Sequence, residues 1–245
     1  MNERDDAQSH VDEPPVQDPP RVHPIAGEVV SVTLPYDGGR TVAAYLPPEP
    51  AEAVVYAADG QLISQWGGYL EAAAGVPATA IVGVHATDDI DEMARISEYS
   101  PRFDPERFEA HERFFVQDVR DWARDELGIV APADRTAVYG VSAGAELALA
   151  LGIRHPDVYG AILAASPGGG YQPPPTLPGP LPRTYLVAGT REPWFAGNAT
   201  RWATALSDAG ADVVMLERAG DHGDPFWQAE FPRMVAWACR GDVAG

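Results

Sequence analysis

The sequence predicts an α/β fold in which a mostly parallel sheet follows an antiparallel hairpin and carries helices on both faces. Short apolar runs of strand length alternate with helical stretches along most of the chain, which is the order of a doubly wound sheet. Near the start, two alternating segments are joined by Asp37-Gly38-Gly39, a turn signal that favours a hairpin. Such folds place their chemistry at the carboxyl ends of the strands.

Each element follows from a local pattern. Alternating residues predict the hairpin strands at Val29–Leu34 and Thr41–Leu46. Short apolar runs predict the other strands at Val54–Ala58, Ala80–His85, Thr136–Tyr139, Ala161–Ala165, Tyr185–Ala188 and Val213–Leu216. Helices are expected at Glu106–Leu127, 145–155, Asn198–Ala209 and Phe226–Ala238, and a Gly- and Pro-rich loop at 168–182.

Length and composition limit the organisation of the chain. Residues 1–23 are acidic and rich in Pro and Asp, so we expect a disordered tail followed by a single α/β domain over 24–245. The net charge is −19, with 17 arginines and no lysine. An acidic surface of this kind repels phosphate backbones and anionic lipid, which disfavours nucleic acid and membrane surfaces as partners.

The expected compartment follows from three sequence features. The one cysteine, Cys239, cannot form an intrachain disulfide and is expected to be a buried structural thiol. The N-terminus has no signal-peptide pattern, and no apolar run is long enough to cross a bilayer. These features together predict a cytoplasmic protein.

A serine flanked by glycines follows the strand at Thr136–Tyr139. Gly140 to Gly144 reads Gly-Val-Ser-Ala-Gly, with Ser142 at its centre and an Ala- and Leu-rich helix after it. Strand, sharp turn and helix around a serine form the nucleophile elbow of α/β-hydrolases, in which the glycines leave room for a strained serine backbone. We therefore expect Ser142 to be a nucleophile, the alternative being an ordinary turn serine.

The serine hydroxyl needs a base and an acid that orients it. Only His222, among six histidines, lies both after the serine and beyond the last predicted strand, where α/β-hydrolases carry their base. The next carboxylate after the strand Tyr185–Ala188 is Glu192, our first candidate for the acid. Asp221 and Asp224 remain alternatives for the acid, and an exposed loop histidine is the alternative for His222.

The tetrahedral intermediate of acyl transfer needs N–H donors for its oxyanion. One donor is expected to be the backbone N–H of Ala143, at the start of the elbow helix. The second should come from the loop after an earlier strand, where Gly60 allows a turn that directs the N–H of Gln61 or Leu62 toward the site.

Five segments of the chain form a recognisable set. They are Val55–Gln61 with its Asp-Gly-Gln end, Arg95–Pro101, the elbow at Val138–Gly144, Ala188–Asn198 with its Arg-Glu-Pro, and the loop with His222 followed by Trp227. Together they resemble the putative-esterase family of α/β-hydrolases and, within it, the enterochelin (ferric-siderophore) esterases. The resemblance implies an α/β-hydrolase fold, the Ser142, His222 and Glu192 roles given above, an oxyanion loop at Gly60-Gln61 and a substrate-side guanidinium at Arg95.

Three tryptophans follow predicted loops at the active end of the sheet. Trp66, Trp194 and Trp227 could form an aromatic pocket for an acyl or aryl group, with packing onto the core as the alternative. For Arg95 the alternative is an ion pair with Glu98. Because the chain has neither a His-Glu-x-x-His motif, nor zinc spacing, nor a P-loop, we expect no metal and no cofactor.

These inferences predict a serine esterase that cleaves carboxylic esters of small molecules through an acyl-enzyme, with a siderophore lactone as one candidate substrate. The alternatives are a general carboxylesterase or thioesterase, an acyltransferase of the same fold, and a binding module with a silent triad. Nothing in the sequence predicts an oligomeric state.

Overall fold

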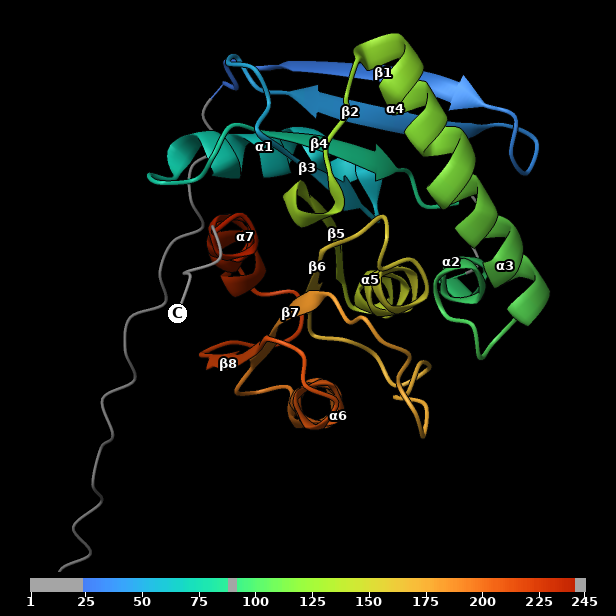
Figure 1. The fold of residues 1–245 in the computed structure, drawn as a ribbon, viewed down its shortest axis with the longest axis vertical. Coiled ribbons are helices and arrows are strands. Elements are labelled where there is room, and N and C mark those ends of the chain that lie inside the picture. Colours follow the sequence, from blue (N-terminus) through green and yellow to red (C-terminus); the bar gives the residue numbers. More distant parts are fainter. Residues whose placement is uncertain (1–23, 88–91, 241–245) are drawn as a thin grey trace, which may run out of the picture.

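An eight-stranded sheet with the order β1-β2-β4-β3-β5-β6-β7-β8 runs through the molecule (Figure 1). A computed structural model describes residues 24–87 and 92–240, so the tail predicted at 1–23 lies outside the described residues. β1 (Glu28–Leu34) and β2 (Arg40–Leu46) form the antiparallel hairpin. The remaining strands are β3 (Ala53–Ala57), β4 (Thr79–Val84), β5 (Thr136–Val141), β6 (Ala161–Ala165), β7 (Arg183–Gly189) and β8 (Val213–Arg218). β2 is antiparallel to β4, and all further pairs are parallel, which confirms the predicted fold class.

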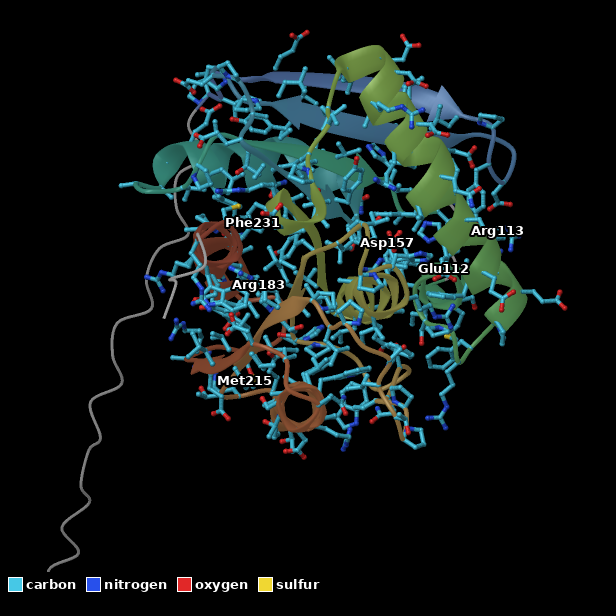
Figure 2. The ribbon with its side chains drawn as sticks, viewed as in Figure 1. Glu112, Arg113, Asp157, Arg183, Met215 and Phe231 are labelled. Atoms are coloured by element: carbon cyan, nitrogen blue, oxygen red, sulfur yellow. The ribbon has the colours of Figure 1, made fainter. Side chains whose placement is uncertain are left out.

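Helices cover both faces of this sheet (Figure 1). One face packs against α1 (Ile63–Ala72) and α7 (Phe226–Ala238), where Phe231 of α7 belongs to the buried cluster (Figure 2). The other face packs against α3 (Pro105–Arg113), α4 (Val119–Leu127), α5 (Ala143–Arg154) and α6 (Pro193–Asp208). α2 (Glu92–Tyr99) lies against α3 and α5. The central strands are therefore buried on both sides, which explains why their sequences are continuous apolar runs.

The predicted long helix at 106–127 is present, but a π-helical segment divides it. Phe114–Asp118 joins α3 to α4, and the Asp104 side chain caps α3 by accepting the Arg107 N–H at 3.0 Å. Phe114 and Phe115 are both buried, so the wider turn fits two adjacent aromatic rings into the core. Periodicity alone does not reveal such a bulge, because the flanking helices keep the same face.

The helices α1 and α2 were not predicted from the sequence. α1 contains Gly67 and Gly68, which lower the intrinsic helix propensity. Gly67 is nevertheless required, because a Cβ there would collide with the ring of Tyr45 on β2. Tertiary packing thus outweighs propensity in α1. α6 also begins earlier than predicted, since Pro193 is compatible with the first turn of a helix.

Within the described ranges, no helix has the length and apolar character needed to cross a membrane.

Candidate active site

The turn between β5 and α5 holds the predicted nucleophile. Ser142 has φ 57° and ψ −122°, a strained conformation for a residue with a side chain. A Cβ at Gly140 would collide with the backbone of Gly144, and a Cβ at Gly144 would lie only 3.0 Å from the Ala58 side chain. The two glycines therefore make the turn sterically feasible, and the turn places the Ser142 hydroxyl at the carboxyl end of the sheet.

A line of hydrogen bonds runs from this serine to a buried carboxylate. Ser142 Oγ lies 3.0 Å from His222 Nε2, and His222 Nδ1 lies 2.6 Å from Glu192 Oε2. When Nδ1 carries the ring proton and donates it to Glu192, Nε2 is left as an acceptor for the serine proton. The geometry is that of a nucleophile, a general base and the acid that orients the base.

The loops after β7 and β8 are joined to each other, which explains how acid and base meet. The Thr190 N–H donates to the Arg218 carbonyl at 2.8 Å, and the Arg191 N–H donates to the Gly220 carbonyl at 3.0 Å. These bonds extend the pairing of the two strands beyond their ends. The carboxylate that follows β7 and the imidazole that follows β8 are consequently held side by side.

Ser166 is a site residue that sequence reasoning missed. It follows β6 directly, is fully buried and has φ 48°. Its hydroxyl donates to Glu192 Oε1, which also accepts the Gly189 N–H, and its own oxygen accepts the Trp227 Nε1–H at 2.8 Å. Both Glu192 oxygens therefore have fixed partners. The position of Ser166 at a strand end was the one signal that could have identified it.

Two aromatic rings enclose the imidazole. The Phe195 ring stacks on His222 with centroids 3.8 Å apart, and the Trp227 ring meets it edge-on at 4.9 Å. Trp227 was predicted to contact substrate, but its indole N–H is bound to Ser166 and its ring supports His222. Phe195 was not predicted at all.

The two alternative acids bind a different partner. Asp221 accepts from Arg191 Nε at 2.8 Å, and Asp224 accepts from Arg191 Nη2 at 3.2 Å. All three side chains are solvent-exposed to at least 39 %. In the structure it is therefore Glu192 that contacts His222 Nδ1.

The predicted oxyanion loop follows β3. Asp59 has the left-handed values φ 57° and ψ 48°, and Gly60 begins a short 3₁₀ turn. A Cβ at Gly60 would collide with the backbone of Gly83 on β4, so the loop requires glycine there. The Gln61 side-chain oxygen accepts the Ala86 N–H at 3.1 Å, which ties the loop to the segment that follows β4. The Ala143 N–H is the first of α5 and has no acceptor within the helix, so it is suited to bind an anion.

Arg95, predicted to face the substrate, is held by Asp59. Its Nε and Nη2 donate to the two carboxylate oxygens at 2.8 and 2.6 Å. The alternative partner Glu98 binds Arg40 and Arg107. A contact between Arg95 and substrate stays a prediction.

The other two predicted tryptophans lie in different surroundings. Trp66 is 7 % exposed and packs against Tyr139 and Phe231 on the face covered by α1 and α7, so we assign it to the core and not to a substrate pocket. Trp194 is 58 % exposed and meets the Phe195 ring edge-on at 4.7 Å. It is the tryptophan that remains free to contact a ligand beside the site.

Metal ligands do not gather in the described part of the chain. Among these residues, no group of three or more His, Cys, Asp or Glu side chains is arranged to hold an ion.

Comparison with known proteins relates this geometry to a family. The sequence pattern of the family described as "Putative esterase" matches residues 33–173, which is more than half of the chain. No curated protein sequence matches the chain.

Solved structures share the fold at low sequence identity. Enterochelin esterase from Shigella flexneri has a TM-score of 0.73 at 18 % identity, over 88 % of this chain and 60 % of that one. A ferulic acid esterase from the anaerobic fungus Anaeromyces mucronatus has a TM-score of 0.67 at 14 % identity, over 90 % of this chain and 93 % of that one. A fluorophosphonate-binding serine hydrolase from Staphylococcus aureus has a TM-score of 0.65 at 12 % identity, over 88 % of this chain and 99 % of that one. The chain thus has an α/β-hydrolase fold and spans about 60 % of the enterochelin esterase.

Proposed function

The chain belongs to the esterase family that matches its residues 33–173, and from this premise we propose that it is a serine esterase that hydrolyses carboxylic esters of small molecules. The observation that carries the proposal is the line from the Ser142 hydroxyl through His222 to Glu192. A strained serine between glycines, with a histidine within hydrogen-bond distance of its hydroxyl, is expected where a nucleophile must be activated.

The first half of the reaction forms an acyl-enzyme. Ser142 Oγ attacks the ester carbonyl carbon while its proton passes to His222 Nε2, and the negative charge on Glu192 stabilises the resulting imidazolium. The backbone N–H groups of Ala143 and Gln61 hold the oxyanion of the tetrahedral intermediate. The intermediate collapses when the C–O bond to the alcohol breaks and His222 returns the proton to the leaving oxygen.

The second half repeats the same steps with water. His222 Nε2 takes a proton from water as its oxygen attacks the acyl carbon, the same two N–H groups hold the new oxyanion, and the carboxylic acid leaves as Ser142 regains its proton. Stacking of Phe195 and the edge contact of Trp227 keep the imidazole in one orientation for both halves.

Removal of the nucleophile tests this proposal directly. We expect the Ser142→Ala protein to lose about three to five orders of magnitude in kcat for p-nitrophenyl acetate, with an unchanged melting temperature. Hydrolysis by Ser142→Ala at the wild-type rate would contradict the proposal, whereas failure of a fluorophosphonate to label Ser142 in the wild-type protein would favour a binding module with a silent triad.

For the substrate we propose an ester whose acyl part carries an aromatic ring, with a siderophore lactone of the enterochelin type as the first candidate. Phe103 and Trp194 are 52 % and 58 % exposed. A Cβ at Gly170 would collide with the Phe103 ring, and one at Gly169 would collide with Trp194, so the two rings flank this loop. The Gly168 N–H donates to the Ser142 carbonyl at 3.4 Å, which joins the loop to the elbow. A flat acyl ring could lie along this glycine surface between the two aromatic side chains.

The names of neighbouring structures support an acyl part that carries an aromatic ring. The enterobactin esterase of Shigella flexneri was crystallised with 2,3-di-hydroxy-N-benzoyl-serine, and others are ferulic acid esterases. We expect kcat/KM to be higher for enterobactin and methyl ferulate than for aliphatic esters of equal leaving group. We also expect Trp194→Ala to lower kcat/KM for the aromatic substrates alone, by about tenfold. Equal loss for aliphatic esters would contradict the aromatic subsite.

Acyl transfer to an alcohol or thiol remains the alternative within the same fold. Product analysis with added acceptor separates the two, because a hydrolase yields free acid whatever acceptor is present. Cytoplasmic location likewise stays a prediction.

A further inference from the structure

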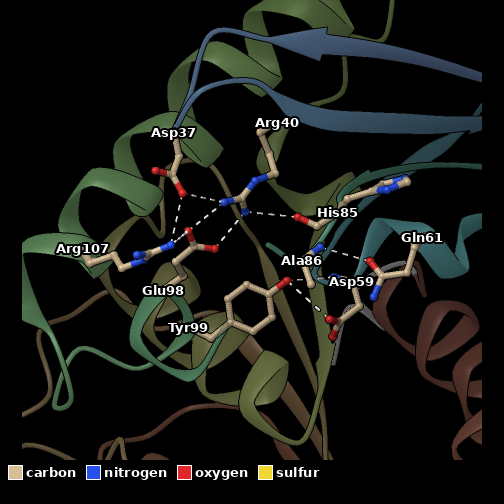
Figure 3. Close-up of polar contacts among 9 residues, drawn as sticks. All are labelled: Asp37, Arg40, Asp59, Gln61, His85, Ala86, Glu98, Tyr99 and Arg107. Carbon is tan, nitrogen blue, oxygen red and sulfur yellow. Dashed lines mark hydrogen bonds and ion pairs between the residues drawn. The ribbon is translucent and has the colours of Figure 1, made fainter. Parts of the chain in front are cut away.

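A buried carboxylate joins the proposed oxyanion loop to α2. Asp59 is 4 % exposed, and its N–H donates to the Tyr99 hydroxyl oxygen at 3.2 Å. Its two carboxylate oxygens accept from Arg95 at 2.8 and 2.6 Å. Tyr99 is fully buried and its hydroxyl faces Asp59 (Figure 3). Both the backbone and the side chain of Asp59 are therefore bound to residues of one helix.

That helix is itself anchored by buried charges. Glu98, next to Tyr99, is fully buried and accepts two hydrogen bonds from Arg40 of β2, each 2.8 Å long. Arg107 of α3 donates to the same carboxylate at 3.0 Å, and Arg40 also donates to the His85 carbonyl at 3.3 Å (Figure 3). A shift of α2 would break these pairs in a buried environment, which is costly. Tyr99 thus gives the oxyanion loop a rigid support.

Asp59 also borders the elbow. A Cβ placed on Gly144 would lie 3.2 Å from Asp59 Oδ2 and 3.8 Å from Arg95 Nη2. Gly144 is the second residue of α5, directly after Ala143, whose N–H is one proposed oxyanion donor. The other proposed donor, Gln61, comes two residues after Asp59. The carboxylate consequently lies between the two segments that have to converge on the oxyanion.

We propose that Asp59, clamped by Arg95 and Tyr99, is the positioning residue that sets the separation between the Gln61 and Ala143 N–H groups. Arg95 then acts by holding Asp59 rather than by binding substrate. This inference rests on the proposed ester hydrolysis, because the separation matters only if an oxyanion forms there. The oxyanion exists in the transition state and not in the bound ester, so loosening the clamp lowers kcat and leaves KM unchanged.

The test compares two clamp variants with matched variants elsewhere. Asp59→Asn weakens the Arg95 pair. Tyr99→Phe removes only a hydroxyl, which accepts the Asp59 N–H at 3.2 Å and donates to Asp59 Oδ1 at 3.5 Å. The molecule offers a control of the same chemistry, since Glu230 of α7 accepts two hydrogen bonds from Arg218 and one from the Tyr185 hydroxyl. Glu230→Gln and Tyr185→Phe therefore repeat both changes at a second buried carboxylate.

We expect kcat for p-nitrophenyl acetate, per fluorophosphonate-titrated site, to fall by about 10- to 100-fold in Asp59→Asn and by about 3- to 10-fold in Tyr99→Phe. KM should change less than about twofold, and both control variants should keep kcat within about twofold of wild type. Arg95→Lys, which keeps the charge but not the paired hydrogen bonds, should fall between wild type and Arg95→Ala in kcat.

Other results would overturn this inference and can be distinguished from results that overturn the proposed function. Wild-type kcat in both clamp variants, or an equal loss in the Glu230 and Tyr185 controls, would contradict it. A rise in KM at unchanged kcat in Arg95→Ala would return Arg95 to the role of substrate ligand. Wild-type protein that neither hydrolyses the ester nor reacts with the fluorophosphonate would instead overturn the proposed function.

Discussion

The described part of the chain includes two glutamate–histidine pairs with similar local geometry. In the first, His222 Nδ1 lies 2.6 Å from Glu192, and the side chains are 32 % and 2 % exposed. In the second, His155 Nε2 lies 3.0 Å from Glu112, and the side chains are 30 % and 11 % exposed. Glu112 lies on α3 (Figure 2), and His155 directly follows α5. Distance and burial therefore do not distinguish the proposed base from a structural histidine.

The difference lies in what else each pair touches. Glu112 also accepts from Arg154 at 2.7 Å, so a cation already balances its charge. Burial alone would raise the pKa of Glu112, but its contacts with His155 and Arg154 outweigh this and lower it. Glu192 is held instead by neutral donors, the Ser166 hydroxyl and the Gly189 N–H. Its charge thus remains available to an imidazolium at His222, whose other nitrogen faces a strained serine.

The largest predicted effect compares the two histidines. We expect His222→Gln to lower kcat by about four orders of magnitude, because His222 Nε2, 3.0 Å from Ser142 Oγ, is the proposed acceptor of the serine proton. His155→Gln should leave kcat within about twofold of wild type, since that ring takes part in no reaction step. Steady-state hydrolysis of p-nitrophenyl acetate measures both. Similar losses of kcat in the two variants would contradict the different roles that we give to the two histidines.

The carboxylates should differ by a smaller factor. Glu192→Gln keeps the shape of the side chain but removes the charge that stabilises the imidazolium, and we expect kcat to fall by about 10³-fold. Glu112→Gln, the same change in the other pair, should alter kcat by less than about twofold. If Glu192→Gln kept wild-type kcat, Glu192 would be a structural carboxylate and the hydrolysis would depend on Ser142 and His222 alone.

Ser166→Ala tests whether the neutral donors that hold Glu192 matter for the reaction. The change removes one hydrogen bond to Glu192 and leaves the Trp227 indole N–H without its acceptor. We expect kcat to fall by about tenfold, since Glu192 keeps the Gly189 N–H and its contact with His222. A matched Ser100→Ala variant, which removes a buried hydroxyl near α2, should leave kcat unchanged. Equal kcat in wild type and Ser166→Ala would mean that Gly189 alone orients the carboxylate.

The sequence contained enough to predict the fold and the order of the three proposed catalytic residues. Strand ends converge at one edge of a parallel sheet, so strand positions together with the elbow motif and the Ser–acid–His order of α/β-hydrolases placed Ser142, Glu192 and His222 together. Ser166 could not be found in this way, because a serine after a strand has no distinctive pattern and its role depends on burial and a positive φ. Trp66 was grouped with Trp194 because an indole after a strand is equally typical of a core and of a pocket.

The pairing of Asp59 with Arg95 could not be predicted for a related reason. The two residues are 36 positions apart, and local spacing favoured Glu98 as the partner of Arg95. The helix α2 turns Glu98 toward Arg40 and Arg107 instead. Ion pairs between distant elements depend on how helices pack, which periodicity does not specify.

His111 extends the comparison to a described histidine whose ring forms no hydrogen bond to a carboxylate. It is fully buried, and in the described structure neither ring nitrogen has a hydrogen-bond partner. Burial lowers its pKa from 6.5 to about 4. Between these values the unfolded chain binds a proton that the folded chain does not, so stability is full above about pH 6.5 and falls as the pH drops toward 4.

A His111→Phe variant should therefore lose less stability on acidification than wild type. At about pH 5 the wild-type penalty is about 2 kcal/mol, which the variant does not incur. Thermal unfolding at about pH 7.5 and about pH 5 measures the difference, and kcat at neutral pH should be unchanged because His111 is no part of the proposed site. A melting temperature that falls equally in both proteins would contradict this explanation.

The most direct test of the account is to identify the residue that acts as the nucleophile. Wild-type protein is treated with a fluorophosphonate, digested and mapped by mass spectrometry, beside Ser142→Ala, His222→Gln and His155→Gln. The account predicts one adduct, on the peptide that contains Ser142, formed at the wild-type rate in His155→Gln, strongly slowed in His222→Gln and absent in Ser142→Ala. An adduct on another residue, or labelling of Ser142 that is indifferent to His222, would contradict it.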